Sequence, residues 1–225
     1  MNDAVPTQSA DAAHAPDRVT RHSVTARLGH WLMAGSTLVL LGTAFGPILG
    51  IEFAWVDIHW MTGVLLTLLV LLHVLRYALF KPLRTMLIGP RDLRDGIQVL
   101  QFNLRQTEIA PPLPGKYSLS QKAIHAVFAC VVLTAIVTGC LMLAKIDSPF
   151  WERNPYFLSD PTWGVIYVLH GFAALALITL VMLHIYFSLR PEKRLYLRSM
   201  ITGALTRLEL SEHHDPQRWQ TGDRQ

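Results

Sequence analysis

YVLHGFAALALITLVMLHIYF, residues 167–187, contains no charged side chain but carries two histidines, His170 and His184. A helix needs about 20 consecutive apolar residues to cross the hydrocarbon core of a bilayer. The stretch therefore predicts a membrane-spanning helix. Imidazole is costly to place in hydrocarbon, so two histidines within such a helix indicate a function.

Three more apolar runs of similar length occur along the chain. Of its 225 residues, 51% are hydrophobic and only 16% are charged, which is too apolar for an ordinary soluble domain. We therefore predict an all-α integral membrane protein with one four-helix membrane domain over residues 23–210. Its four predicted spans cover residues 28–49, 58–80, 121–144 and 162–189.

The segments outside the spans are more polar. Residues 1–22 lack the basic-then-apolar layout of a cleaved signal and are predicted to be a disordered cytoplasmic tail. Residues 83–107 mix apolar and charged side chains at helical spacing, which predicts a helix at the membrane interface. Residues 211–225 are predicted to be a polar C-terminal tail, in which His213 and His214 are solvated.

The basic residues indicate how the chain is oriented in the membrane. Eighteen of the 20 Lys and Arg residues lie before residue 28, in the connection 76–122, or from residue 190 onward. By the positive-inside rule these three segments face the cytoplasm, which places both termini there. The basic pI is then explained by topology beside lipid headgroups, and gives no reason to predict binding to nucleic acid.

Two histidine pairs repeat the same spacing. His59 and His73 are fourteen residues apart, as are His170 and His184. On a helix, this spacing places two residues about 40° apart around the axis and about 21 Å apart along it. Each pair therefore lies on one face of its helix at two depths in the membrane.

Histidines at two depths are typical of membrane haem proteins, in which facing helices supply two axial imidazoles to each iron. Depth predicts that His59 and His170 together bind an outer haem. At the inner depth, His184 has three candidate partners, His30, His73 and His125, and the spacing alone does not choose among them. No Cys-x-x-Cys-His motif occurs, so both haems are predicted to be b-type and held without covalent attachment.

Two other classes of protein fit these spans less well than a cytochrome. A membrane metal transporter also uses histidines, but it would need acidic or further polar residues within the spans, and these spans contain almost none. A purely structural anchor would not need six histidines in or at the edge of its spans.

Several short stretches, in this order and spacing, resemble one family. They are RLGHW at 27–31, DIHWMTG at 57–63, GKYSLSQK at 115–122, TG at 138–139, LHGFAALALITLVMLHIYF at 169–187, and MITG with HHDPQRW between 200 and 219. Together they resemble the gamma, or cytochrome b, subunit of membrane-bound respiratory formate dehydrogenases. The resemblance covers about residues 20 to 220.

The resemblance implies a role for particular residues. It assigns the cytoplasmic-side haem to His30 and His184 and the other haem to His59 and His170. It also implies a quinone site beside the cytoplasmic haem, formed by a set of residues before and within the spans: Ser118, Ser120, Gln121 and His184.

The sequence also departs from the pattern of the resembled family. Enterobacterial members carry Asn and Gly in place of Ser118 and Ser120, and an alternative interpretation is that Ser118, Ser120 and Gln121 only cap the third span. Those members also lack His73 and His125, which are predicted to be hydrogen-bonded residues around the haem, with a proton relay and haem ligation as the alternatives.

The resemblance implies a di-haem anchor subunit of the bacterial inner membrane. Electrons from a catalytic formate dehydrogenase subunit would reach it through a periplasmic iron–sulfur subunit and cross to quinone. Related cytochrome b anchors serve hydrogenases and sulfur-compound oxidoreductases, so these donors remain alternatives. No residue of this chain is expected to contact formate.

Overall fold

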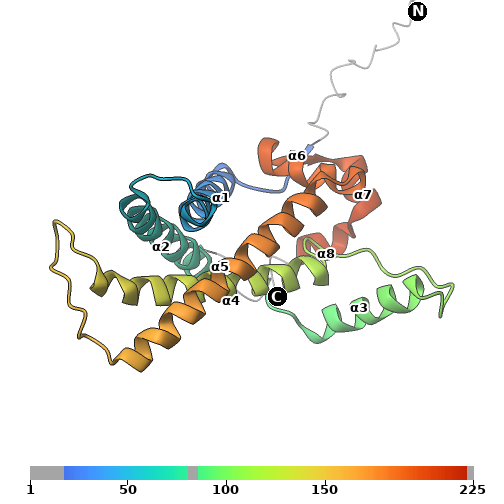
Figure 1. Cartoon of the computed structure of the whole chain (residues 1–225). Coiled ribbons are helices and arrows are strands. Elements are labelled where there is room, and N and C mark those ends of the chain that lie inside the picture. The colour runs from blue at the N-terminus through green and yellow to red at the C-terminus, as the bar shows by residue number, and fades with distance from the viewer. Residues whose placement is uncertain (1–17, 81–85, 222–225) are drawn as a thin grey trace, which may run out of the picture.

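Four long helices make up most of the structure. The computed structural model describes residues 18–80 and 86–221. The long helices are α1 (Val24–Phe45), α2 (Trp55–Phe80), α4 (Leu119–Met142) and α5 (Asp160–Leu189). α1 packs mainly on α2 and α4 mainly on α5, and smaller contacts join α2 to α4 and α1 to α5 (Figure 1).

These helices correspond to the four predicted spans, and each is long and apolar enough to cross a membrane. Large apolar side chains point outward from them; Val168 and Phe172 on α5, for example, are 70% and 71% exposed. Such an exposed apolar surface is stable in lipid but not in water. The prediction of an all-α four-helix membrane protein is confirmed.

Local signals set where the spans begin. α1 starts at residue 24, four residues before the predicted start, because the Ser23 hydroxyl accepts a hydrogen bond from the amide of Ala26 at 3.4 Å. α5 starts at residue 160, with Pro161 in its first turn. Short 3-10 turns, η2 (Pro47–Leu49) and η4 (Leu143–Lys145), extend α1 and α4.

The connection between α2 and α4 contains α3 (Pro90–Asn103), which is shorter than the helix predicted over residues 83–107. Part of that prediction, residues 83–85, lies outside the described residues. Gly89 precedes the helix, and its amide donates a hydrogen bond to Asp92 at 2.8 Å. Asp92 also forms a 2.8 Å ion pair with Lys122, which holds α3 beside the start of α4.

A small cap follows α5 and includes a segment from the other end of the chain. It consists of η5 (Pro191–Lys193), α6 (Arg194–Thr202), β2 (Ala204–Thr206), α7 (Arg207–His213) and α8 (Pro216–Thr221). Strand β1 (Arg18–Thr20) pairs antiparallel with β2, with Val19 opposite Leu205. Figure 1 shows this cap at the end of α5, near the starts of α1 and α4.

The cap corrects two predictions about the tails. Residues 1–17 lie outside the described residues, but Arg18–Thr20, which were assigned to a disordered tail, form a paired strand. His214, which was assigned to a solvated tail, has no exposed surface. Both predictions were wrong because the pairing between the two ends spans almost the whole chain, and local composition does not reveal it.

Arg21 and His214 join the two ends of the chain. The Arg21 guanidinium, 5% exposed, donates to Nε2 of His214 at 2.9 Å and lies 4.6 Å from the centre of the Tyr196 ring. Nδ1 of His214 donates to the carbonyl of Gly115 at 2.7 Å. Since Nε2 must accept a hydrogen bond from a cation, this arrangement requires neutral His214. Burial, with a contribution from the charge of Arg21, lowers the pKa of His214 from 6.5 to about 4.

The His214 contact makes the stability of the protein depend on pH. Between about pH 4 and 6.5 the unfolded chain binds a proton at residue 214 that the folded chain does not bind. The stabilising contribution of neutral His214 to the free energy of unfolding is therefore fully present above pH 6.5. It is lost as the pH falls toward 4, by up to about 1.4 kcal/mol per pH unit. We expect the melting temperature of the wild type to fall more between about pH 7.5 and about pH 5 than that of His214→Gln. An equal fall in the melting temperature of both proteins over this pH range would contradict the prediction.

Candidate functional site

The outer histidine pair faces across the bundle. His59 lies in the first turns of α2 and His170 in the third turn of α5. Their ring centroids are 6.3 Å apart, and the ring planes make an angle of 73°. The structure therefore brings together the two histidines that depth alone had paired.

Two threonines fix the orientation of these rings. Nδ1 of His59 lies 2.7 Å from Oγ1 of Thr43 on α1, and Nδ1 of His170 lies 2.8 Å from Oγ1 of Thr138 on α4. Each threonine hydroxyl donates to backbone carbonyls of its own helix, so its oxygen is left to accept. Each Nδ1 then carries the proton, and each Nε2 has a free lone pair for a metal.

The backbone of α4 lies close to His170. A Cβ atom added at Gly139 would lie 3.3 Å from Cε1 of the His170 ring. A side chain at this position would push against the ring that Thr138 holds in place. The dipeptide Thr138–Gly139 therefore provides both the hydrogen bond and the room that His170 needs.

The inner pair consists of His30 on α1 and His184 on α5. Their ring centroids are also 6.3 Å apart, with an angle of 52° between the planes. Phe128 of α4 packs edge-on against His184 at 5.7 Å. No hydrogen bond to the ring of His30 or His184 occurs within residues 18–80 and 86–221, which distinguishes this pair from the outer one.

The geometry of both pairs fits an iron held between two imidazoles. An imidazole nitrogen binds a transition metal at about 2 Å and lies about 1.2 Å from the ring centre, so two rings on opposite sides of one iron have centroids about 6.4 Å apart. The observed separation is 6.3 Å in each pair. Haem b, bound only through such axial ligands, is the group that these residues fit.

A third pair occupies the same inner end of the bundle. His73 of α2 and His125 of α4 have centroids 6.4 Å apart, and the Tyr77 ring lies 4.8 Å from His73. The structure thus places His184 beside His30, and pairs the two remaining candidates with each other. Ligation by either inner pair stays a prediction.

The six histidines of the long helices form three facing pairs of imidazole rings. Across the described parts of the chain, no three His, Cys, Asp or Glu side chains gather as a set that could hold a bare metal ion. Two imidazoles suffice for haem, because the macrocycle supplies the other iron ligands, whereas a bare metal ion needs more protein ligands.

Ser118 and Gln121 cap α4. Oε1 of Gln121 accepts a hydrogen bond from the Ser118 amide at 3.0 Å, and Oγ of Ser118 accepts one from the Gln121 amide at 3.4 Å. Oγ of Ser120 lies 2.9 Å from Oγ of Ser118. This is the alternative role that the sequence left open for these residues. A contact between them and quinone stays a prediction.

Sequence reasoning missed the role of Thr43 and did not single out Thr138. A threonine in a membrane helix ordinarily bonds to a carbonyl of its own helix, so its type and position give no signal of a second partner. The only available signal was the TG dipeptide at 138–139, which was noted as part of the resemblance. The partner of each threonine lies on another helix and becomes visible only in the fold.

Replacing either threonine should weaken haem binding at the outer pair. Thr43→Val and Thr138→Val keep the shape of the side chain but remove the acceptor for Nδ1, so the histidine loses its fixed tautomer. Outer-shell partners of this kind are worth roughly 10- to 100-fold in affinity. We expect haem to dissociate faster from the outer pair, as measured by transfer to apomyoglobin. Thr179→Val is a suitable control, because the Leu175 carbonyl is the one partner of Thr179 among the described residues. Equal rates of haem loss in all three variants would contradict the prediction.

The chain is similar in sequence to known cytochrome b subunits. The formate dehydrogenase cytochrome b556 subunit of Haemophilus influenzae is 25% identical over 213 residues, covering 90% of this chain and 82% of the relative. The cytochrome b556(fdo) subunit of formate dehydrogenase from Escherichia coli K12 is 25% identical over 217 residues, covering 90% of this chain and 92% of the relative. The sequence model of the prokaryotic cytochrome b561 family matches residues 21–203, and the chain belongs to this family.

Proposed function

We propose that this chain, which binds haem b as a member of a cytochrome b family, is the di-haem membrane subunit of a respiratory formate dehydrogenase. The observation that carries the proposal is that facing imidazole pairs occur toward both ends of the bundle: His59 with His170 at one end, and His30 with His184 and His73 with His125 at the other, with centroid separations of 6.3 to 6.4 Å. Haem at each end would supply one-electron transfer, and two such positions would let electrons cross the membrane in short steps.

In this proposal the outer pair receives electrons and the inner pair delivers them. His59 and His170 would hold one iron, with Thr43 and Thr138 fixing their rings. His30 and His184 would hold the other. The relatives are named as cytochrome subunits of formate dehydrogenase, which supports a catalytic formate dehydrogenase subunit as partner. A periplasmic iron–sulfur subunit is the proposed direct donor, as the resemblance to the gamma subunits of respiratory formate dehydrogenases implies.

Quinone is the proposed acceptor, at the start of α4. Phe128 contacts His184 and His125 contacts His73, so the first turns of α4 lie beside both inner pairs. Ser118, Ser120 and Gln121 begin the same helix. A quinone bound there would be close to the inner haem, and its reduction would take up protons from the cytoplasm.

The test of the function is reduction by formate. Membranes containing the chain and its partner subunits should show b-type α bands when formate is added, and these should disappear when a soluble quinone is added. Membranes that contain the chain without partners should bind haem but show no response to formate. Reduction by hydrogen but not by formate would instead assign the chain to a hydrogenase.

The proposed location is the bacterial inner membrane with both termini in the cytoplasm. A fused alkaline phosphatase, which is active only outside the cytoplasm, should be inactive after Arg105 or Arg207 and active within the connection 147–160. The physical reason is that Lys and Arg are concentrated in the connection 76–122, which contains Arg105, and in the segment from residue 190 onward, which contains Arg207. The opposite activity pattern would reverse the proposed direction of electron transfer.

A further inference from the structure

The proposed function gives no partner to the imidazoles of His73 and His125. In that function His30 and His184 hold the inner haem, so the ring nitrogens of the other two histidines bind no iron. These nitrogens also form no hydrogen bond with any described residue, although both residues lie within the spans. A polar group in hydrocarbon is costly unless it has a hydrogen-bond partner. The two imidazoles therefore indicate a bound polar group.

The separation of the two rings fits one oxygen atom between them. A hydrogen bond from an imidazole N–H to an oxygen is about 2.8 Å long, and the nitrogen lies about 1.2 Å from the ring centre. If His73 and His125, with centroids 6.4 Å apart, both donate to one oxygen, the angle at that oxygen is about 105°. This is close to the angle of about 120° between the lone pairs of a carbonyl oxygen. The same separation suits an iron between opposed rings, and haem analysis tells the two apart.

The pair lies next to both the proposed quinone segment and the inner haem pair. His125 is four residues after Gln121, so the two side chains are neighbours on one face of α4. Phe128 follows His125 by three residues, and its ring centroid lies 5.7 Å from that of His184. An electron from an iron at His184 would therefore travel only a short way to a molecule bound at His73 and His125.

The position of the pair between α2 and α4 makes it accessible. Contacts between these two helices are smaller than those of α1 with α2 or of α4 with α5. His73 is half-buried and His125 is exposed. A quinone dissolved in the bilayer can therefore reach the two imidazoles without separating the tightly packed helices.

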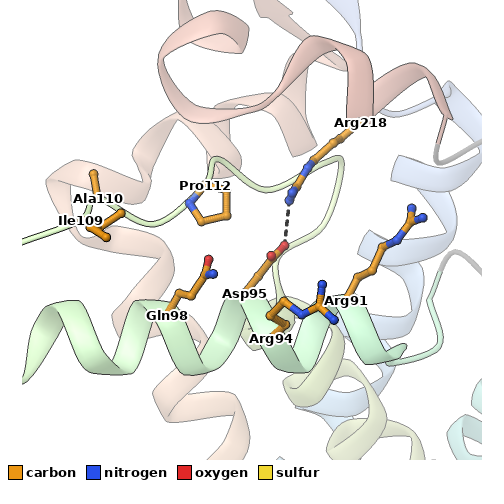
Figure 2. A pocket seen from close by; sticks show the side chains of 8 residues that line it. All are labelled: Arg91, Arg94, Asp95, Gln98, Ile109, Ala110, Pro112 and Arg218. Carbon is orange, nitrogen blue, oxygen red and sulfur yellow. Dashed lines mark hydrogen bonds and ion pairs between the residues drawn. The ribbon is translucent and has the colours of Figure 1, made fainter. Parts of the chain in front are cut away.

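A cavity of about 420 Å³ lies elsewhere, between α3, the connection that follows it, and α8. Figure 2 shows Arg218 extending into it toward Asp95, with which it forms a 2.7 Å ion pair. None of the six histidines of the long helices is among its described lining residues, which are Arg91, Arg94, Asp95, Gln98, Ile109, Ala110, Pro112 and Arg218. A quinone in this cavity would contact none of the imidazoles, so the pair on α2 and α4 is the better candidate.

We propose that His73 and His125 bind the head group of quinone by donating hydrogen bonds to one of its carbonyl oxygens. This inference rests on the proposed function, in which quinone is the electron acceptor. Two electrons from the inner haem, arriving one at a time, and two protons from the cytoplasm convert quinone to quinol. Negative charge grows on the carbonyl oxygen when the first electron arrives, and hydrogen bonds to a charged acceptor are about twice as strong as those between neutral groups. Both imidazoles therefore favour the transfer.

Reoxidation of the reduced haems tests the proposal. The chain is purified with its partner subunits, its haems are reduced with a stoichiometric amount of dithionite, and decylubiquinone and menadione are added in separate stopped-flow series. The dependence of the reoxidation rate on quinone concentration gives an apparent Kd. His73→Leu and His125→Leu should each raise this Kd about three- to tenfold, which corresponds to one hydrogen bond. His73→Gln and His125→Gln keep an N–H donor and should recover most of the affinity.

Haem content and a control variant separate the alternatives. Each variant should contain as much haem as the wild type, and loss of haem would overturn the proposal because the pair would then bind iron. Thr134→Val is the matched control on α4, because the Thr134 hydroxyl donates to the Cys130 carbonyl of its own helix. It should keep the wild-type Kd.

Two outcomes distinguish this inference from the proposed function. An unchanged Kd in both His73→Leu and His125→Leu would overturn the inference and leave quinone as the acceptor. A wild type whose haems are not reoxidised by either quinone would overturn quinone as the acceptor, and this inference with it. Because dithionite supplies the electrons, neither outcome depends on which substrate the partner subunits oxidise.

Discussion

Replacing His170 by alanine is expected to remove one of the two proposed b-type haems and to leave the other in place. The substitution takes away one of two imidazoles whose centroids are 6.3 Å apart, and the remaining His59 would face an iron with an open side. His59→Ala should have the same effect. Pyridine haemochrome analysis of the purified chain should therefore give about half the wild-type haem per protein in each variant.

His213→Ala is the matched control, because His213 lies at the end of α7, away from the four long helices, and should not change the haem content. The low-spin signal that remains in His170→Ala should be unaltered in electron paramagnetic resonance, since the inner pair is not touched. Full haem content in both His59→Ala and His170→Ala would contradict the assignment of the outer pair.

The second large effect is expected at the inner pair. His30→Ala and His184→Ala should each remove the other haem, because the rings of these two residues face each other at 6.3 Å. His73→Ala and His125→Ala should keep both haems if, as proposed, His30 and His184 hold the inner one; the 6.4 Å separation of His73 and His125 makes these two variants the decisive comparison. The expected haem content is again about half in the first two variants, and unchanged in the last two.

The inner assignment has a clear counter-outcome. Loss of haem in His73→Ala, with retention in His30→Ala, would transfer the inner haem to the pair on α2 and α4. The double variant His73→Ala with His125→Ala provides a check, because it should retain two haems only if neither residue is a ligand.

The fold was predictable because its main determinants are local. Length and hydropathy identify a span within a single segment, and the structure has a long helix at each predicted position. The fourteen-residue spacing likewise fixes the face and depth of His59 and His170 within their own helices. Two residues at the same depth with no competitor can have only each other as partner.

The partner of His184, the threonine contacts and the cap could not be predicted, because they depend on contacts between segments that are distant in the sequence. Three candidates share the depth of His184, and only the packing of α1 beside α5 brings His30 to it. Thr43 and His59 lie on different helices, and Arg21 and His214 are separated by 193 residues. A periodicity within one segment carries no information about such contacts, so β1 was assigned to a disordered tail, and His214 and α8 to a polar one.

The threonine hydrogen bonds give the two ends of the bundle different electronic character. An imidazole that donates from Nδ1 is a stronger electron donor at Nε2, and a more electron-rich ligand set favours ferric over ferrous iron. The outer pair has two such bonds, whereas no described residue provides one to the inner pair. In the proposed di-haem arrangement the outer iron would therefore have the lower potential. Electrons would move downhill toward the inner iron, which helps them to cross against a membrane voltage that is negative inside.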